Sequence, residues 1–502
     1  MNKKTSSMWL YPIIILGGVL RYYNNTAVAL WHDEAFSALY IRYPIGEMMH
    51  RITLDVHPPL YYWVLRLWSY VFGSGLLSLR SLSILFGILT IYACYLFVKE
   101  AFQNEKLAIL ASFFLAINPF QIQYSLEARM YTLGTFLILF SSYLLIRALN
   151  SNKTSVWAAY AVITAACFYT HYFLFFSVAA QGLYFLYWLW QQKRFTLNFK
   201  KDNLTLKGLG SYLLSLIIFL PWVPTLLAQV QRVEKSFWIP APDRWSIPST
   251  IWKMAFGGQG NDHITLAVIT LVAIGLIIYY FRESAPPARW FIMLGVAVPF
   301  VISLLLSFRQ AIYQDRYFVF ASLYFTILIA GTIYVVPKYT TRRTLTFLLA
   351  AFSIVIFFKN WNDLGVKNLF INREINHKPG MAAAALVINS EAKLGNKIYI
   401  GSSFVYFTFR YYNKTSIHPL LYSNEPLKNL PHFSGTALLN DDDLIMDFGQ
   451  AKKNDTVWLL WTTGFGGSKP NVPGTWLKID EKSFGDTPGF KGDIYVTQYR
   501  AG

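Results

Sequence analysis

The chain has 502 residues, of which 55% are apolar, 18% aromatic and only 14% charged, whereas about 25% of the residues of a soluble protein are charged. So little polar surface excludes a set of soluble domains and indicates a membrane protein. The net charge is +18, but the charges form no basic tract, which argues against a nucleic-acid partner. Cys94 and Cys167 both lie in apolar runs, which excludes a disulfide framework and a cysteine-based metal site.

Eleven apolar segments are candidate membrane spans, since a span needs about 20 mostly apolar residues. The first segment follows a basic start without a small-residue cleavage site, so it is expected to be retained and not removed as a signal peptide. A further apolar segment, 59–73, is short, carries Arg66 at its centre and is rich in Trp and Tyr, which predicts an interfacial helix on the outer surface. The eleven expected spans are 8–23, 76–98, 105–120, 130–148, 155–171, 172–190, 207–227, 264–281, 289–308, 317–336 and 343–359.

The distribution of Lys and Arg predicts the orientation of these spans. With a cytoplasmic N-terminus, the loops on the cytoplasmic side hold sixteen Lys or Arg against four Asp or Glu. An odd number of spans then places the C-terminal part of the chain outside, together with two long loops, 24–75 and 228–263. The second loop is rich in Trp, Pro and Gly, and we expect it to lie in the membrane interface, with a lid over the substrate as the alternative.

Residues 361–502 are expected to form a soluble domain, because the apolar runs there shorten to strand length. This part holds 15 Lys or Arg and 13 Asp or Glu. The pattern indicates an α/β domain with an Ala-rich helix at 379–392 and strands at 397–401, 404–412, 456–461 and 493–499. It contains no nucleophile elbow, P-loop or dinucleotide fingerprint.

Two segments before the second span concentrate candidate functional residues, since charges near the membrane are costly to retain. Trp31-His32-Asp33-Glu34 places two adjacent carboxylates just beyond the first span. A partly desolvated carboxylate can take the proton of an acceptor hydroxyl. The alternative is that Asp33 caps a short helix over 35–40.

The second segment is Asp55-Val56-His57-Pro58-Pro59-Leu60-Tyr61-Tyr62. The two prolines suit the start of the 59–73 helix, and His57 is then an ordinary loop residue. Asp33, Asp55 and His57 together could suggest a metal site, but their spacing matches no ligand signature. We therefore expect no cofactor, with a divalent metal as the minor alternative.

Three arginines on the predicted outer side run against the charge bias: Arg129, Arg309 and Arg316. Arginine binds phosphate in a bidentate manner and stays charged, so these residues suit the phosphate of an anionic lipid. The alternatives are ion pairs with Glu127 and Asp315, or contact with ordinary lipid.

Four motifs in one order resemble the bacterial branch of the protein O-mannosyltransferase-like enzymes. These enzymes belong to the C-type (polytopic) glycosyltransferases, which include the lipid A aminoarabinose transferases. The motifs are WHDEAFSALYI, DVHPPLYYWVLRLW, FGSGLLSLRSLS and YSLEARMY, and the resemblance covers residues 1 to about 360. It implies a polytopic α-helical fold of the C-type glycosyltransferases with about eleven transmembrane helices. It also implies inverting transfer of a monosaccharide from a polyprenyl-phosphate donor, such as an undecaprenyl phosphate sugar, without an essential metal.

The resemblance further implies roles for individual residues. Asp33 matches the general base, and Glu34 beside it is assigned to the same catalytic pair. Residues assigned to the donor and its phosphate are Arg129, Glu127, His57, Arg316 and Tyr317. Further candidate site residues are Asp55, His32, Tyr61 and His171, of which His171 is equally well explained as a capping or core histidine.

The sequence therefore predicts a multi-pass glycosyltransferase of the inner or plasma membrane, with its C-terminal α/β domain periplasmic or extracellular. Its partners are a polyprenyl-phosphate-linked sugar and an acceptor hydroxyl on a glycolipid, an envelope glycan or a protein. No segment resembles the large lumenal β-trefoil insertion of the eukaryotic enzymes, so a glycolipid or glycan fits as well as a protein. The alternatives are a transporter or flippase, which would line a path within the spans with charges, and a polymerase or ligase of lipid-linked glycans.

Overall fold

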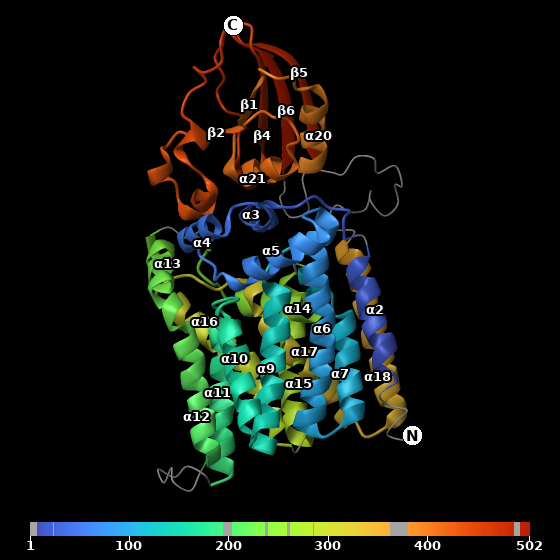
Figure 1. Cartoon of the computed structure of the whole chain (residues 1–502). Helices are drawn as coiled ribbons and strands as arrows, with labels where there is room; N and C mark the ends of the chain where they lie inside the picture. Colours follow the sequence, from blue (N-terminus) through green and yellow to red (C-terminus); the bar gives the residue numbers. More distant parts are fainter. Residues whose placement is uncertain are drawn as a thin grey trace.

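The computed structural model describes residues 8–23, 25–193, 203–235, 239–258, 262–284, 286–361, 380–485 and 492–502. These residues form a bundle of long helices that carries a smaller, sheet-containing domain on one end (Figure 1). One buried apolar core cluster contains residues of both parts, for example Phe36 and Phe407.

A helix coincides with each of the eleven segments expected as spans. Within the described residues, seven helical segments are long and apolar enough to cross a membrane. An eighth is added if α7 and the short α8 (Pro119–Ser125), which are bent by 58°, form one broken span. The eleven helices that coincide with the expected spans are α2 (Leu10–Tyr22), α6 (Leu76–Phe102), α7 (Glu105–Ile117), α9 (Tyr131–Ser151), α10 (Thr154–Phe168), α11 (Leu174–Gln191), α12 (Asn203–Phe219), α15 (His263–Glu283), α16 (Ala288–Ser307), α17 (Val319–Val335) and α18 (Tyr339–Trp361).

The break between α7 and α8 is made by Asn118 and Pro119. Proline disfavours a helical conformation of the preceding residue, and the Asn118 side chain caps α8 by accepting from the Gln121 N–H at 3.0 Å. Arg21 of α2 is buried at this break and donates to the carbonyl of Ala116 at 2.9 Å and to Ser125 Oγ at 3.1 Å. A cation is favourable at the C-terminal end of α7, where carbonyls lack helical partners, so Arg21 stabilises the bend that leads the chain toward residues 126–130.

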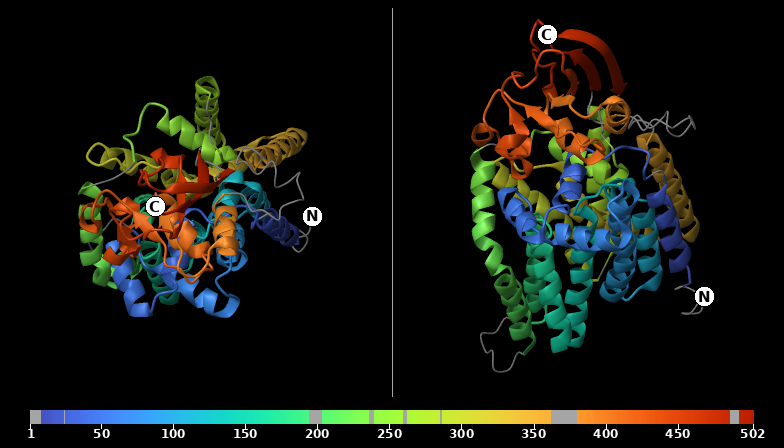
Figure 2. Two further views of the ribbon diagram at one scale, coloured as in Figure 1. Left: turned by 90° about the horizontal axis from the view of Figure 1, so that it is seen from above. Right: turned by 45° about the horizontal axis from the view of Figure 1, so that its top comes forward.

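The two long loops and the C-terminal domain share one end of the bundle, as the odd number of spans predicted. Three helices of the first loop, α3 (His32–Tyr40), α4 (Ile45–Leu54) and α5 (Leu60–Phe72), lie between the bundle and the domain (Figures 1 and 2). The segment expected as an interfacial helix is α5, and its Arg66 donates to the carbonyls of Ile41 and Tyr43. The second loop contains α13 (Val223–Lys235) and α14 (Ser246–Phe256), and α14 packs against α15 and α17. The side of the membrane that this end faces stays a prediction.

The C-terminal domain contains a six-stranded sheet in the order β3-β2-β1-β4-β6-β5. The first four strands are parallel and the β4-β6-β5 pairs are antiparallel. This architecture confirms the α/β prediction. The elements are α20 (Met381–Glu391), β1 (Lys397–Ile400), α21 (Ser403–Tyr412), β2 (Leu420–Tyr422), β3 (Leu444–Ile445), β4 (Thr456–Thr462), β5 (Leu477–Gly485) and β6 (Asp493–Arg500).

One expected strand of this domain, 404–412, is wrong, because the segment forms helix α21. Ser402 caps the helix by accepting from the Phe404 N–H at 3.3 Å. Its middle residues, 405–409, are all buried, and periodicity cannot distinguish a short run of buried helix from a strand. The strand β5 was not expected, because it is largely exposed and polar. The expected helix at 379–392 corresponds to α20. Residue 379 of the expected range lies outside the described residues.

The C-terminal domain docks on the first loop of the bundle. The ring centroids of Phe36 and Phe407 are 4.6 Å apart, and the Leu30 N–H donates to the Tyr412 hydroxyl at 2.9 Å. Arg51 of α4 donates to Asn440 Oδ1 at 2.9 Å. The predicted boundary at residue 360 falls at the end of α18, and residues 362–379 lie outside the described part of the chain.

Candidate active site

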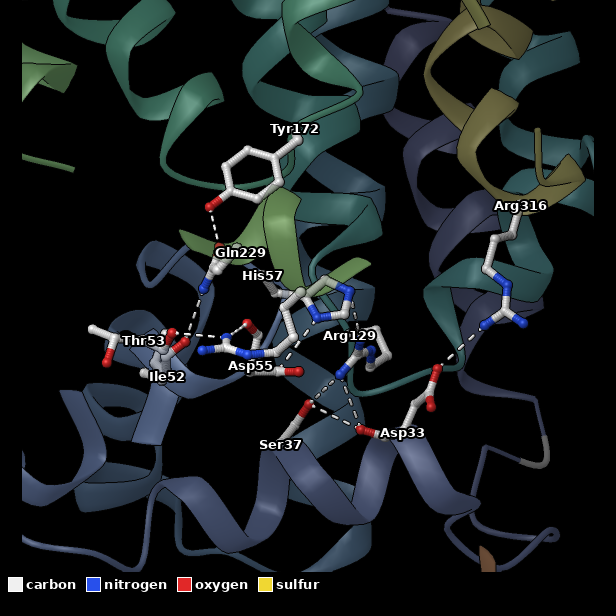
Figure 3. Close-up of polar contacts among 11 residues, drawn as sticks. Asp33, Ser37, Ile52, Thr53, Asp55, His57, Arg129, Tyr172, Gln229 and Arg316 are labelled. Carbon is white, nitrogen blue, oxygen red and sulfur yellow. Dashed lines mark hydrogen bonds and ion pairs between the residues drawn. The ribbon is translucent and has the colours of Figure 1, made fainter. Parts of the chain in front are cut away.

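Asp33 lies in the first turn of α3, with its carboxylate toward the bundle. The helix N-terminus is capped by Glu34, whose Oε2 is 3.4 Å from the Trp31 N–H, so the alternative that Asp33 is the cap is wrong. Asp33 Oδ2 instead accepts from Arg316 Nη1 at 3.2 Å (Figure 3). The Asp33 side chain is 27% exposed, which leaves it accessible to a substrate.

Arg129 approaches the same turn of α3 from the loop between α8 and α9. Its Nη1 donates to the backbone carbonyl of Asp33 at 3.1 Å and lies 3.5 Å from Ser37 Oγ (Figure 3). The residue is only 3% exposed. Its Nε is buried without a hydrogen-bond partner among the described residues, so one donor remains for a ligand.

A chain of polar contacts leads from Arg129 through His57 to Asp55. His57 Nε2 is 3.3 Å from Arg129 Nη2, and His57 Nδ1 is 3.4 Å from Asp55 Oδ2. A guanidinium can only donate, so Nε2 must accept and the proton of the neutral imidazole lies on Nδ1. Burial would raise the pKa of Asp55, but the hydrogen bond from His57 and nearby positive charge outweigh it and lower the pKa. Asp55 therefore holds His57 in one tautomer.

The two arginines determine the charge state of Asp33. Burial by itself would raise its pKa, but the positive charges of Arg129 and Arg316 outweigh burial and lower the pKa. The carboxylate is therefore ionised near neutral pH, and it can accept a proton.

Glu127 has the opposite tendency. Burial, and then the negative charge of Glu34, raise the pKa of Glu127 to about 8. Its Oε2 is buried and finds no hydrogen-bond partner in the described part of the chain. Near neutral pH the protonated Glu127 can donate a hydrogen bond to an anionic ligand. Among the described residues, Glu127 does not form the alternative ion pair with Arg129, because Arg129 contacts α3 and His57 instead.

Glu34 has contacts that suit a structural role, and the catalytic role expected from the sequence stays a prediction. It is fully buried, with Oε1 2.8 Å from Arg80 Nε and Oε2 2.7 Å from Arg80 Nη2. Oε1 also accepts from the Ala128 N–H at 2.8 Å. With its oxygens engaged in this way, Glu34 ties α3 to α6 and to the loop that carries Arg129.

Arg80 was not singled out from the sequence, although it lies within one of the four motifs. Arg80 lies at the start of a span on the predicted outer side. A basic residue there runs against the charge bias, and this could have marked Arg80 as a candidate. An ion pair of the outer arginines with Asp315 was the alternative, and the Asp315 carboxylate instead contacts Lys253 and accepts from Thr250 Oγ1 at 2.6 Å.

The other two candidate histidines, His171 and His32, lie in different surroundings. His171 Nδ1 accepts from the Phe173 N–H at 3.1 Å, and its ring is 5.0 Å from that of Tyr317 and 6.2 Å from that of His57. Burial lowers its pKa well below the usual range, and the positive charges of Arg129 and Arg316 act in the same direction. His171 is therefore neutral, with Nε2–H buried and unpartnered within the described chain. The His32 ring packs instead against Phe404 and other aromatic side chains of the C-terminal domain.

The segment that carries Asp55 is anchored by α13. Gln229 Nε2 donates to the carbonyl of Ile52 at 3.0 Å, and Arg232 Nη1 donates to that of Asp55 at 2.9 Å. Tyr172 donates in turn to Gln229 (Figure 3). Tyr61 of α5 is also a candidate site residue, and it is fully buried. Arg309 is 86% exposed and pairs with Glu234.

No three His, Cys, Asp or Glu side chains of the described residues come together in a way that could hold a metal ion. The cofactor requirement stays a prediction.

Comparison with solved structures identifies the architecture. The ArnT structure from Cupriavidus metallidurans bound to undecaprenyl phosphate matches with a TM-score of 0.60 at 11% identity, over 98% of each chain. The chain has the fold of a C-type glycosyltransferase. ArnT from the same organism in the apo state matches with a TM-score of 0.59, again at 11% identity over 98% of each chain. The resemblance expected from the sequence is thereby confirmed in the fold.

A family model described as dolichyl-phosphate-mannose-protein mannosyltransferase matches residues 56–224. This range includes His57 and Arg129 but neither Asp33 nor Arg316. The Archaeoglobus fulgidus oligosaccharyltransferase in the apo form matches at 14% identity and a TM-score of 0.49, over 81% of this chain and 63% of that one, so the chain spans less than two thirds of its length. No curated protein sequence matches the chain.

Proposed function

We propose that the chain transfers a monosaccharide from a polyprenyl-phosphate donor to an acceptor hydroxyl, with Asp33 as the base. The observation that carries this proposal is that Arg316 pairs with the Asp33 carboxylate while Arg129 donates to the Asp33 backbone carbonyl, at the end of the bundle where α3 crosses it. The fold adds support, because it is shared with ArnT, whose structure holds undecaprenyl phosphate.

The reaction is a single displacement. Asp33 takes the proton of the acceptor hydroxyl while the hydroxyl oxygen bonds to the anomeric carbon of the sugar. The bond from that carbon to the donor phosphate oxygen breaks, and the lipid phosphate leaves with the bonding electrons. Attack from the side opposite the phosphate inverts the anomeric configuration.

The arginines stabilise the charge that develops on the leaving phosphate. Arg129 offers an Nε–H that has no partner among the described residues, and Arg316 pairs with Asp33 before the donor is bound. A donor phosphate competes for Arg316, and withdrawal of this cation makes Asp33 a stronger base. Donor binding thus activates the base.

Two uncharged donors complete the phosphate site of this proposal. The protonated Glu127 and the Nε2–H of His171 are buried near the arginines without partners in the described chain. Each can donate to a phosphate oxygen. Buried donors without partners are unfavourable in the empty protein, and a ligand that accepts from them gains affinity.

The transporter or flippase alternative has less support. A transport path would require unpaired charges along the spans, whereas Asp33 and the residues that contact it gather at α3, which lies at one end of the bundle (Figure 1). The buried Arg21 lies within a span, but it is engaged by backbone carbonyls and by Ser125.

Turnover of the donor tests the proposal. Purified protein in lipid nanodiscs receives a panel of undecaprenyl-phosphate monosaccharides with candidate acceptors, and mass spectrometry follows the released undecaprenyl phosphate. We expect release by the wild type and loss of at least a hundredfold in Asp33→Asn. Asp262→Asn is the matched control, because Asp262 is an exposed helix cap of α15 and Asn caps equally well. Normal turnover by Asp33→Asn would remove the assigned base, and no turnover of any monosaccharide by folded wild type would favour the flippase, polymerase or ligase.

A further inference from the structure

A cleft of about 380 Å³ lies between the bundle and the C-terminal domain. One wall is the end of α3 and the residues after it, including Leu39 and Arg42. The other wall is the end of α21 and the loop that follows, including Arg410 and Thr415. The volume is within the range of small-molecule sites, about 300–1,000 Å³.

The cleft is separate from the candidate active site. Successive helical residues are rotated by about 100°, so Leu39 and Ser37 point to nearly opposite sides of α3. Ser37 and Asp33 contact Arg129, whereas Leu39 lines the cleft. Leu39 is six residues from Asp33, which corresponds to about 9 Å along the helix axis.

The two walls of the cleft each contribute a guanidinium. Arg42 Nη2 donates to the carbonyl of Tyr411 at 3.4 Å, and its guanidinium lies 5.1 Å from the centroid of the Tyr411 ring. Arg410 Nη1 is 3.4 Å from the carbonyl of Leu438 and 3.9 Å from Asp443 Oδ1. Burial lowers the pKa of Arg42, with Tyr411 opposing this shift and the positive charge of Arg410 adding to it. The pKa of Arg410 is raised in spite of burial, because Tyr406, Tyr43 and Asp443 stabilise its charged form.

Of these two arginines, Arg410 has a carboxylate partner, Asp443. None of the described residues that line the cleft is acidic. Asp443 is only 3% exposed, and it also accepts from the exposed His418 at 2.9 Å. Arg42 has no ion pair among the described residues, so its guanidinium can receive an anion placed between the walls, and arginine matches phosphate and carboxylate geometry.

The loop of the second wall supplies ordered polar groups. Asn413 Oδ1 accepts from the Thr415 N–H at 3.0 Å and from its hydroxyl at 2.7 Å. Thr415 Oγ1 accepts from the Ile417 N–H at 3.2 Å. These bonds hold the loop in one conformation, with Ser416 and Thr415 facing the cleft. Hydroxyl and amide groups in fixed positions suit the hydroxyls of a sugar.

We propose that this cleft binds an anionic sugar, one that carries a phosphate or carboxylate group, as part of the acceptor. The assignment of the sugar to the acceptor rests on the proposed function, whereas the binding itself does not. An extended glycan held here by its anionic residue has a short distance to cover along α3 to Asp33. The cleft would thereby select charged over neutral acceptors.

Binding is measured without any donor, so its outcome is separate from that of the transfer assay. Protein in nanodiscs of neutral lipid is titrated calorimetrically with glucosamine 1-phosphate, glucuronate, glucose and inorganic phosphate. We expect at least one of the anionic sugars to bind tenfold or more tightly than either glucose or inorganic phosphate. Equal affinity for glucose, or for inorganic phosphate alone, would overturn the proposal.

Variants locate the site. Arg42 is exposed at its wall, so Arg42→Gln should fold normally and weaken the anionic sugar at least tenfold, while Arg42→Lys retains part of the affinity. Arg309→Gln removes the same charge from an exposed arginine at the end of α16 and should change nothing. Unchanged affinity in Arg42→Gln would exclude the cleft. If nanodiscs of anionic lipid abolish the Arg42-dependent binding, the occupant is a lipid headgroup and the sugar assignment fails.

Discussion

Arg316 Nη1 lies 3.2 Å from Asp33 Oδ2, although the two residues are 283 positions apart in the chain. The ion pair keeps the carboxylate ionised, and it also weakens it as a base, because a close cation stabilises the charged form. In the proposed reaction the donor phosphate draws Arg316 away. The base therefore reaches its full strength only after the donor is bound, which favours an order of binding with the donor first.

The acidic side of the pH profile should depend on Arg316. Only ionised Asp33 can act as the base, so activity is present above its pKa and is lost as the pH falls through it. Arg129 and Arg316 lower this pKa against the effect of burial. Arg316→Gln should therefore raise the pKa of Asp33 and move the acidic loss of kcat/KM to higher pH, besides lowering its maximum. Profiles of donor turnover for Arg316→Gln and Arg309→Gln check this, and coinciding acidic limbs would contradict it.

The loss of activity on the basic side of the pH profile should reflect the ionisation of Glu127. The group has a pKa of about 8, and the proposed hydrogen bond to phosphate requires its proton. Donor kcat/KM should then fall as the pH rises through about 8. Glu127→Gln keeps an N–H donor and cannot ionise, so its basic limb should disappear while activity near pH 7 is largely kept. An unchanged basic limb in this variant would mean that another group titrates there.

Arg129 should affect donor binding in particular. Its guanidinium makes directional bonds to α3 and His57, which lysine cannot reproduce, and a hydrogen bond to a charged group is worth about 1.5–3 kcal/mol. Arg129→Lys should raise the donor KM by roughly tenfold or more. Initial rates over a range of donor concentrations test this, with the acceptor KM as the internal reference. Equal rises in both KM values would indicate a general distortion of the site.

Glu34→Gln should reduce stability. The substitution leaves Arg80 buried beside a neutral group, and breaking a buried ion pair costs about 3–5 kcal/mol. We expect a clearly lower thermal unfolding temperature for Glu34→Gln in nanodiscs and little change for Asp33→Asn, whose side chain is partly exposed. A Glu34→Gln protein of normal stability without transfer activity would support the catalytic role that the sequence suggested.

The contact of Arg21 with the α7–α8 bend can be tested through a neighbouring glycine. A Cβ at Gly87 would lie 2.5 Å from Ser125 Oγ and 3.0 Å from Arg21 Nε. Gly87→Ala should destabilise the protein by about 1–3 kcal/mol, as expected for overpacking. Gly275→Ala is the matched control within another span, since nothing lies within 4 Å of its Cβ position. Equal unfolding temperatures for the two variants would show that the bend tolerates displacement of Arg21.

The sequence by itself determined the membrane character, the helical segments and the end of the bundle at which the candidate residues gather. These features follow from local composition: about 20 apolar residues in a row partition into a bilayer whatever they pack against. Whether an odd or an even number of spans precedes a loop then determines the end of the bundle at which that loop lies. The motif around Asp33 and the one around Arg129 were informative for the same reason, since each is contiguous in the chain.

Only the tertiary structure decided which charges are partners. Asp33 and Glu34 are neighbours in sequence, yet one carboxylate is partly exposed beside Arg316 and the other is buried against Arg80. Adjacent residues of a helix point about 100° apart, so their environments are set by distant segments. The same applies to α21, which is a helix because of its cap and its burial against the rest of the protein. Such long-range contacts depend on how the helices pack, and local composition carries no record of that packing.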